Sequence, residues 1–516
     1  MAKVLIDGEL LTLEQFDAVV HSAATAEIAS AAHEKMSSSR RLIERVVESD
    51  SPVYGVNTGF GKMASARISR DQIRQLQLNL VRSHACGIGA PLSEPETRAM
   101  LLLRASAIAR GFSGVRPIVA ETLCAMLNQR VHPLIPSQGS VGASGDLAPL
   151  AHLAQVAIGE GEAIFRGQRM AGAEAMKLAG IAPLVLEAKE GLALLNGTQA
   201  MLALLLIGLR EAEISVATAD IAAALSVDAL RGSPGAFDER IAKVRPYPGH
   251  AETARNLLRL LEGSEIRESH RSPEKDKRVQ DAYSLRCTPQ VHGAVRDALA
   301  QVRATLTIEL NSATDNPLVF AGGDGNSGEV ISGGNFHGQP LAMAADQLAV
   351  ALATLAGISE RRIEQMTNPQ TSLLPAFLVP DAGLNSGFMI LQVAAAALVS
   401  EMKAQSAPHS VDSIPTSANQ EDYVSMGMGA ARRIASMNFN LRNVLAIELL
   451  SACQGIDLLA PLKTGALAEH AYRRIRSVSK KVDADRSLAR DIAAVAEEIA
   501  KGTIADVLLA GPAGSR

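Results

Sequence analysis

One short stretch of small residues, 139–146 (Gly-Ser-Val-Gly-Ala-Ser-Gly-Asp), has the most unusual chemical potential in this chain. Neither Gly142 nor Gly145 has a Cβ, so the backbone between them can turn back on itself sharply. If it does, the Gly145 amide nitrogen can attack the Ala143 carbonyl carbon, and loss of two waters leaves an exocyclic methylene at Ser144. The stretch therefore predicts an electrophile made from the protein's own backbone, which no ordinary side chain supplies.

The spacing of these glycines excludes three commoner glycine-rich motifs. It is not G-x-G-x-x-G, and no Gly-Lys-Ser/Thr follows to make a phosphate-binding P-loop. A nucleophile elbow around Ser144 would need glycine where Asp146 stands. The remaining alternative is a plain turn in which Asp146 caps a helix that begins near Leu147, so the rest of the chain must decide.

Further loops rich in Gly, Asn and Ser interrupt very apolar segments, and they span residues 54–61, 195–199, 332–337 and 417–422. Function concentrates on loops that a rigid scaffold holds in place. Several such loops in one helical protein predict a single composite site.

The stretch Gly142 to Leu150 resembles the signature of the aromatic amino-acid ammonia-lyase family, and the resemblance extends over about residues 50 to 460. The members of that family carry a self-made 4-methylidene-imidazol-5-one (MIO) group. The resemblance implies that Ala143, Ser144 and Gly145 become the MIO and that no external cofactor is needed. An electrophile that captures the substrate amine helps because a free ammonium is a poor leaving group.

The resemblance also implies roles for residues in the other loops. Tyr54 matches the loop tyrosine that removes the β-proton, and Arg286 matches the group that clamps the substrate carboxylate. Loop packing for Tyr54 and a structural ion pair for Arg286 are the alternatives. Gln280 and Tyr283 match two further site residues of the family. Asn196 matches a residue that contacts the amine or carboxylate, Asn311 matches a polar site position, and Phe336 matches the ring that packs beside the MIO. The alternative for Asn196, Gln280 and Asn311 is a structural role, in which each buried amide forms hydrogen bonds that hold a loop in place.

Two positions point to the substrate. Ser83-His84 resembles the pair in histidine-acting members, where phenylalanine and tyrosine lyases tend to have Phe-Leu or His-Leu. Glu421 stands where those enzymes usually have Gln, and a carboxylate can accept from an imidazole N–H or serve as a second base. Both positions predict conversion of L-histidine to trans-urocanate and ammonia. A helix-start carboxylate is the plain alternative for Glu421.

Other functions remain open from the sequence. Ala282, Tyr423 and Gln339 depart from common histidine-lyase residues, which leaves room for a tyrosine or phenylalanine ammonia-lyase or a 2,3-aminomutase. The Gly-Ser-Ser-x-x-Met-Pro signature of fumarase-type lyases is absent. A non-catalytic relative would keep the triplet uncyclised.

Composition predicts the scaffold that must position these loops. The 516 residues are 47% hydrophobic and only 3% aromatic, with abundant Ala and Leu, which favours helices and close helix packing. Residues 341–355 carry apolar side chains at helical spacing, and the apolar segment 390–399 predicts a central bundle helix. We expect a mainly α fold of the long-helix-bundle type, with an N-terminal region over 1–210 that carries the base and the MIO, and a bundle with C-terminal helices over 211–516.

Charge and cysteine usage limit the partners. A net charge of −4 gives no reason to expect nucleic acid or a membrane surface as a partner, and no clustered metal-ligand set is present. The uncharged run 191–209 contains Asn196, Thr198 and Gln199, so a buried helix after a polar loop is expected there rather than a membrane span. Four dispersed cysteines fit a cytoplasmic protein. The resemblance implies a homotetramer with shared active sites and a small amino-acid substrate.

Overall fold

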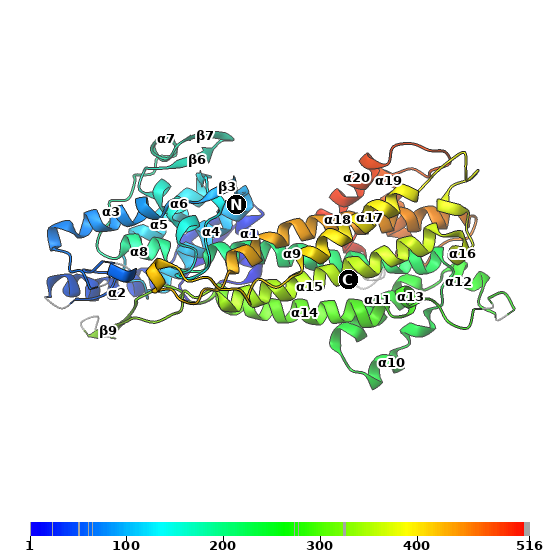
Figure 1. Cartoon of the computed structure of the whole chain (residues 1–516), viewed down its shortest axis with the longest axis horizontal. Coiled ribbons are helices and arrows are strands. Elements are labelled where there is room, and N and C mark those ends of the chain that lie inside the picture. Colours follow the sequence, from blue (N-terminus) through cyan, green and yellow to red (C-terminus); the bar gives the residue numbers. More distant parts are fainter. Residues whose placement is uncertain are drawn as a thin grey trace. The chain divides into compact units, whose positions relative to one another are not determined.

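The computed structural model describes residues 2–22, 24–49, 52–59, 61–63, 65–272, 274–276, 278–322 and 327–509 (Figure 1). Phe60, within the loop 54–61, therefore lies outside the described residues. The fold is mainly helical, which confirms the predicted class. Two compact units are present: unit 1 comprises Met1–Ile207, Ala304–Asp346 and Pro408–Arg432, and unit 2 comprises Gly208–Arg303, Gln347–Ala407 and Arg433–Arg516.

The chain leaves unit 1 close to the boundary predicted at residue 210. It then returns twice, so segments 304–346 and 408–432 belong to unit 1 although the prediction assigned them to the second region. Long helices cause this pattern, because α9 (Gln199–Ala229), α14 (Thr288–Leu310), α15 (Gln339–Thr367) and α18 (Gly427–Leu458) each continue from one unit into the other.

Unit 1 combines short strands with helices of moderate length. Its elements are β1 (Lys3–Ile6), α1 (Leu13–Val20), β2 (Thr25–Ile28), α2 (Ser30–Glu48), η1 (Gly61–Met63), η2 (Arg70–Gln72), α3 (Ile73–His84), β3 (Ile88–Pro91), α4 (Glu94–Ala109), α5 (Pro117–Asn128), β4 (His132–Pro133), β5 (Pro136–Gln138), α6 (Leu147–Ala157), β6 (Glu162–Phe165), β7 (Gln168–Ala171), α7 (Gly172–Leu178), α8 (Glu190–Leu195), β8 (Leu318–Ala321), β9 (Gly328–Ile331) and η5 (Ser417–Asn419).

The strands of unit 1 form small separate sheets. β1 and β2 pair in parallel, with Lys3 opposite Thr25, whereas β3–β5, β4–β6–β7 and β8–β9 are antiparallel. The helices carry the core: every residue of α4 from Thr97 to Ala109 is buried, and a capping box between Ser93 and Glu96 fixes where this helix begins.

The regular elements in the described part of unit 2 are all helices. Besides the continuations of α9, α14, α15 and α18, its elements are η3 (Pro234–Phe237), α10 (Glu239–Val244), α11 (Pro248–Leu261), α12 (Glu265–Ser269), α13 (Tyr283–Arg286), α16 (Pro369–Ser372), η4 (Ala376–Leu378), α17 (Met389–Gln405), α19 (Ala466–Val478), α20 (Ala489–Ala500) and α21 (Asp506–Leu509).

A buried polar network joins the four long helices inside unit 2. His292 Nδ1 on α14 lies 2.8 Å from Asp220 on α9, while Arg362 on α15 donates to Glu448 on α18, and all four side chains are fully buried. Ser226 on α9 also donates to Glu448 at 2.8 Å. Buried charges need such paired partners, so the network fixes how these helices pack. The predicted long-helix bundle is thereby confirmed.

Two predictions about helices have different outcomes. The apolar stripe of residues 341–355 lies in α15 and is buried, from Leu341 to Leu355. α17 forms as predicted, but it is not covered on all sides: Ile390 is 64% exposed and Val393 is 52% exposed, because only one stripe of this helix packs inside the chain.

The run 191–209 folds as expected, with α8, a polar turn, and the buried start of α9. Among the described residues, one helix, α15, is long and apolar enough to cross a membrane by length and composition alone. Because 61% of its apolar window is buried inside the protein, α15 has the character of a core helix.

Candidate active site

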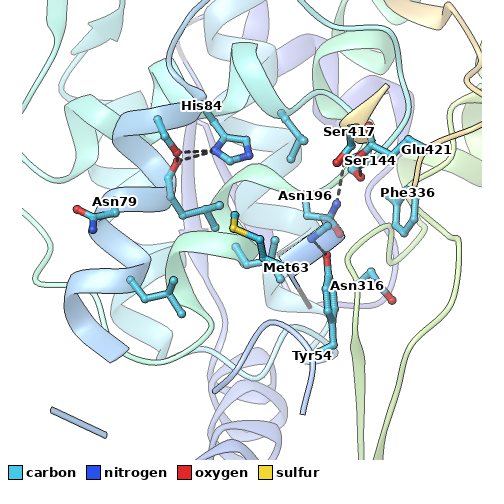
Figure 2. Close-up of a pocket in the computed structure, with 16 residues that line it drawn as sticks. Tyr54, Met63, Asn79, His84, Ser144, Asn196, Asn316, Phe336, Ser417 and Glu421 are labelled. Atoms are coloured by element: carbon cyan, nitrogen blue, oxygen red, sulfur yellow. Dashed lines mark hydrogen bonds between the residues drawn. The ribbon is translucent and has the colours of Figure 1, made fainter. Parts of the chain in front are cut away.

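A cavity of about 430 Å³ in unit 1 brings several of the predicted residues together (Figure 2). Its volume suits a small metabolite. The predicted residues that line it are Tyr54, Ser83, His84, Ser144, Asn196, Phe336 and Glu421. Six separate segments of unit 1 thus contribute to one cavity, and all four of the polar loops lie among them.

The Ala143-Ser144-Gly145 triplet forms a tight turn with little room around it. Gly142 and Gly145 have φ values of +68° and +72°, which favour glycine. A Cβ at Gly145 would lie 2.1 Å from the Gly197 carbonyl oxygen, and Ala143 is only 6% exposed. The turn is held from the other side by Ser425, whose hydroxyl donates to the Gly142 carbonyl at 3.1 Å. This compressed, glycine-dependent geometry fits cyclisation of the triplet.

Asn196 lies directly against the triplet. Its side-chain Nδ2 donates to the Ser144 carbonyl oxygen at 2.8 Å, and its Oδ1 is buried without a hydrogen-bond partner in the described part of the chain. The neighbouring Asp146 N–H donates to the Gly197 carbonyl at 2.7 Å. A donor aimed at the Ser144 oxygen and an orphaned acceptor beside it are what an MIO ring and a substrate ammonium would use.

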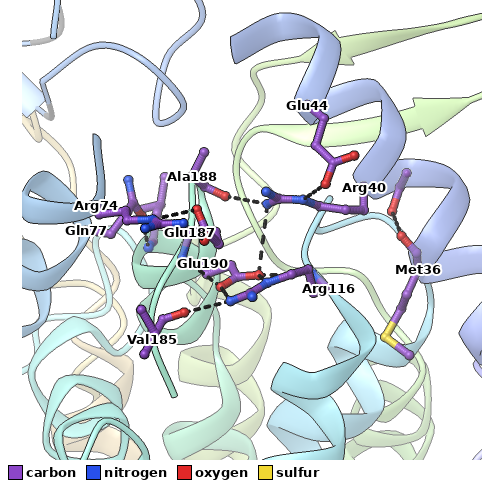
Figure 3. A network of polar contacts seen from close by, with 12 residues as sticks. Met36, Arg40, Glu44, Arg74, Gln77, Arg116, Val185, Glu187, Ala188 and Glu190 are labelled. Carbon is purple, nitrogen blue, oxygen red and sulfur yellow. Dashed lines mark hydrogen bonds and ion pairs between the residues drawn. The ribbon is translucent and has the colours of Figure 1, made fainter. Parts of the chain in front are cut away.

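The helix that delivers Asn196, α8, is anchored at its other end by charge (Figure 3). The Glu190 carboxylate is fully buried and accepts two hydrogen bonds of 2.7 Å from the Arg116 guanidinium. Arg40 donates to the Ala188 carbonyl at 3.0 Å, and Gln77 Oε1 accepts from the Leu192 amide at 3.1 Å. A planar, bidentate pair of this kind is rigid, so it fixes the position of α8 and thereby the position of Asn196 at its end.

Asp146 occupies the start of α6, as the alternative turn interpretation predicts, but its side chain does not cap that helix. Its carboxylate instead accepts from the Met201 N–H in the first turn of α9 at 2.8 Å and from the Ser140 hydroxyl at 3.0 Å. Burial raises the pKa of Asp146 to about 7, and these hydrogen bonds oppose the shift. Asp146 thus ties the triplet loop to the start of α9.

Glu421 lies directly against the triplet in the cavity wall (Figure 2). Ser144 Oγ donates to Glu421 Oε1 at 2.9 Å, and Thr416 Oγ1 donates to Glu421 Oε2 at 2.6 Å. Both carboxylate oxygens therefore have a fixed orientation, held by hydroxyl groups rather than by a cation.

His84 ends α3 on another wall of the cavity. Its Nδ1 lies 2.9 Å from the Leu80 carbonyl oxygen and 3.0 Å from Ser83 Oγ. A carbonyl can only accept, so Nδ1 carries the proton and the lone pair belongs to Nε2. Burial lowers the pKa of His84, opposed by the hydrogen bond to Leu80 and the charge of Glu421. The neutral ring thus offers one acceptor nitrogen.

The Tyr54 loop is anchored by its neighbour Val56. Val56 is fully buried and packs in a core cluster with residues such as Leu42 and Ile43 of α2. The Gly61 N–H donates to the Tyr54 hydroxyl oxygen at 3.4 Å, a long contact that orients the ring toward the cavity (Figure 2).

Besides Ala143 and Gly145, which flank Ser144, four predicted residues do not line this cavity. Asn311 belongs to unit 1, where its side chain exchanges two hydrogen bonds, of 2.8 and 3.1 Å, with the backbone of Leu11. Gln280, Tyr283 and Arg286 belong to unit 2. Tyr283 is 71% exposed, with the Arg286 guanidinium 4.6 Å above its ring, and Arg286 Nε is buried without a hydrogen-bond partner among the described atoms.

Sequence reasoning missed other lining residues: Gly61, Met63, Leu76, Asn79, Leu80, Leu147, Leu192, Asn316 and Ser417. Gly61 and Ser417 stand inside the polar loops 54–61 and 417–422, so loop membership could have identified them. The apolar ones carry no signal, because Leu and Met in a helix are ordinarily core residues. Within the described ranges, no group of three or more His, Cys, Asp or Glu side chains could hold a metal ion.

Comparison with known proteins agrees with this geometry. Residues 11–477 match the family described as aromatic amino acid lyase. The chain is 54% identical over 514 residues to a histidine ammonia-lyase of Koribacter versatilis, covering 98% of this chain and 99% of that protein. Its structure resembles that of a histidine ammonia-lyase from Trypanosoma cruzi, with 42% identity, a TM-score of 0.90 and coverage of 98% and 95%. It also resembles a tyrosine aminomutase from Streptomyces globisporus, with 38% identity, a TM-score of 0.93 and coverage of 98% for both chains.

Proposed function

Because the chain belongs to the aromatic amino acid lyase family, we propose that it eliminates ammonia from L-histidine to give trans-urocanate. One observation carries the choice of substrate: His84 and Glu421 line the same cavity as Ser144 and Tyr54. The Nε2 lone pair of a neutral imidazole and a carboxylate can each accept from a substrate imidazole N–H, whereas a phenyl ring offers no such donor. The relatives that are histidine ammonia-lyases support this choice.

The surroundings of Ala143, Ser144 and Gly145 fit an MIO group. Asn196 and the backbone at Gly197 would hold it, and Phe336 would pack beside it. Once formed, the group supplies a methylidene carbon conjugated to the Ser144 carbonyl, an electrophile for the substrate amine. The Asn196 N–H is placed to stabilise negative charge on the Ser144 oxygen.

The chain's own side chains then bind and move protons. Tyr54 accepts the β-proton, which places it as general base. His84 and Glu421 orient the imidazole ring, and the Thr416 hydroxyl, the donor that remains on Glu421 after dehydration has removed Ser144 Oγ, fixes the direction of its carboxylate. The orphaned Asn196 Oδ1 is available to accept from the substrate ammonium.

The proposal includes a homotetramer with shared active sites. Gln280, Tyr283 and Arg286 of a neighbouring copy would complete the pocket, with Arg286 clamping the substrate carboxylate. The exposure of Tyr283 and of the apolar face of α17 supports burial of these surfaces against other copies. A cytoplasmic location is part of the same proposal and rests on cysteine usage.

The test is separate incubation of the purified protein with L-histidine, L-tyrosine and L-phenylalanine, followed by near-UV absorbance and by chromatography for β-amino acids. We expect urocanate from L-histidine and no product from L-tyrosine or L-phenylalanine. Cinnamate-type products or a β-amino acid, without urocanate, would replace the proposal with an aromatic lyase or an aminomutase. Intact mass adds a second reading, since cyclisation removes two waters.

Variants test the specificity residues. His84→Leu combined with Glu421→Gln should lower kcat/KM for histidine by about 100-fold or more, because two acceptors for the imidazole are lost. The matched control is His33→Leu with Glu121→Gln, a His–Glu pair 3.2 Å apart outside the cavity, which should leave kcat/KM unchanged. Histidine turnover that survives the first double change would overturn the assignment of substrate.

A further inference from the structure

Arg104 is a fully buried cation in the middle of α4. It follows Leu101, Leu102 and Leu103, all buried, and its own side chain is 0% exposed. Its Nη1 donates to the Asn196 carbonyl oxygen at 2.7 Å and to Gln199 Oε1 at 2.8 Å. Both partners are neutral, and Arg104 Nε and Nη2 are buried without any partner in the described part of the chain.

The charge of Arg104 is not neutralised by a bonded carboxylate. Among the described residues none lies within ion-pair distance of it, and the carboxylate of Asp315 is bound instead to Lys189 Nζ at 2.9 Å. Burial lowers the pKa of Arg104, and the charge of Asp315 acts in the opposite direction. An arginine remains charged at neutral pH even so. A buried cation without a bonded counter-charge is costly, and an apolar side chain would fill a purely structural position better.

The guanidinium lies immediately behind the turn that touches the triplet. A Cβ at Gly197 would meet Arg104 Nη1 at 2.5 Å, so only a bare backbone separates the cation from this turn. The Asn196 carbonyl points at Arg104, while the Asn196 side chain donates to the Ser144 carbonyl oxygen at 2.8 Å. Asn196 thus connects the buried Arg104 guanidinium to the Ser144 carbonyl oxygen, on which negative charge would develop.

We propose that Arg104 is a positioning residue for the reaction, which holds the Asn196 amide on the Ser144 carbonyl oxygen and provides a fixed positive charge that favours negative charge on that oxygen. The inference rests on the proposed function, because it concerns the electrophile formed from the triplet. Fixed charges in a dry site are effective since they need no reorganisation during the reaction.

The test compares Arg104→Gln with Arg104→Lys and with a matched control, Arg98→Gln. Arg98 is a second buried arginine of α4, 7% exposed, that donates to the backbone carbonyls of Val19, Val20 and Leu127 and does not line the cavity. Each variant is measured by intact mass, by the rate of covalent cyanide addition without substrate, by kcat and KM for histidine, and by thermal unfolding.

We expect Arg104→Gln to lose two waters as the wild type does, to add cyanide about 10- to 100-fold more slowly, and to lose kcat with little change in KM. Arg104→Lys should recover part of both rates, and Arg98→Gln should lower only the unfolding temperature. An Arg104→Gln protein that has lost two waters by cyclisation and still adds cyanide at the wild-type rate would overturn the inference.

A fourth variant, Gln199→Glu, decides the case in which Arg104→Gln does not fold. Gln199→Glu keeps the guanidinium and the shape of its partner but places a carboxylate at the 2.8 Å contact, which neutralises the charge. It should slow cyanide addition to a similar extent, and the wild-type rate would contradict the inference. A wild-type protein that has lost no water and adds no cyanide would instead overturn the proposed function, and this inference with it.

Discussion

The Asn196 side chain donates to the Ser144 carbonyl oxygen at 2.8 Å, while its own Oδ1 is buried without a hydrogen-bond partner among the described residues. A buried amide usually satisfies both of its ends. Here the Nδ2 end is bound to the triplet and the Oδ1 end has no partner among the described residues, which supports the proposed contact of Asn196 with a substrate group.

Asn196→Ala should therefore lower kcat for histidine by about 100- to 1,000-fold, because it removes a fixed donor to an oxygen that gains negative charge. Asn128→Ala is the matched control: that amide exchanges hydrogen bonds of 2.9 and 2.8 Å with the Ala26 backbone away from the cavity. Steady-state kinetics should show a change in kcat for the first variant and a change in stability alone for the second. Equal kcat values for Asn196→Ala and wild type would remove Asn196 from the site.

Gly145→Ala should prevent loss of the two waters. Its new Cβ would lie 2.1 Å from the Gly197 carbonyl oxygen, a contact that real Cβ atoms do not make, at a φ of +72°. The turn must open to relieve the clash, and the Gly145 nitrogen then moves away from the Ala143 carbonyl. Intact mass spectrometry reads the result directly.

Gly180→Ala separates backbone strain from the clash. Gly180 has nearly the same φ, +71°, but no atom lies within 4 Å of the position of its Cβ. This control bears the cost of about 1 kcal/mol for a left-handed alanine without displacing a neighbour. It should lose two waters normally; if it cyclises no better than Gly145→Ala, contact with Gly197 is not what prevents cyclisation in Gly145→Ala.

How far sequence reasoning reaches depends on whether a residue's role is local. The triplet, Tyr54 and His84 stand in motifs whose composition already departs from ordinary loops, and the apolar stripe of α15 follows from helical spacing. The sequence marks Arg104 only as a single charge in an apolar run, because the role proposed for it depends on a turn more than ninety residues away in the chain.

Two further differences have the same long-range origin. Asn311 pairs with the backbone of Leu11, a contact between distant segments that no local pattern encodes. The exposed face of α17 shows that an apolar helix need not be covered within its own chain. Spacing predicts which residues are apolar, but the surface that covers them is decided by tertiary and quaternary packing.

The pH dependence of turnover should depend on His84. Burial lowers its pKa below the ordinary value of 6.5, so the ring is predominantly neutral at pH 6.5 and above and gains a proton increasingly at lower pH. Protonation removes the Nε2 acceptor. The ratio of kcat/KM for the wild type to kcat/KM for His84→Gln should be constant from pH 8 to 6.5 and should decrease when the pH is lower than 6.5. The ratio is used because titration of the substrate affects both proteins equally and cancels. A ratio that rises on acidification would mean that a cationic His84 is the active form.

The anchoring of α8 by Glu190 can be tested through Arg116→Met. This change leaves the fully buried Glu190 carboxylate without its bidentate partner, and the free energy of unfolding should fall by about 3–5 kcal/mol in chemical denaturation. Arg169→Met is the matched control, since Arg169 makes the same bidentate contact with Glu162 at an exposed surface, and its unfolding midpoint should stay close to that of the wild type. Because α8 carries Asn196, the folded fraction of Arg116→Met should also show a lower kcat. A variant that unfolds like Arg169→Met would show that the Glu190 charge is satisfied by Arg40, 3.9 Å away, without Arg116.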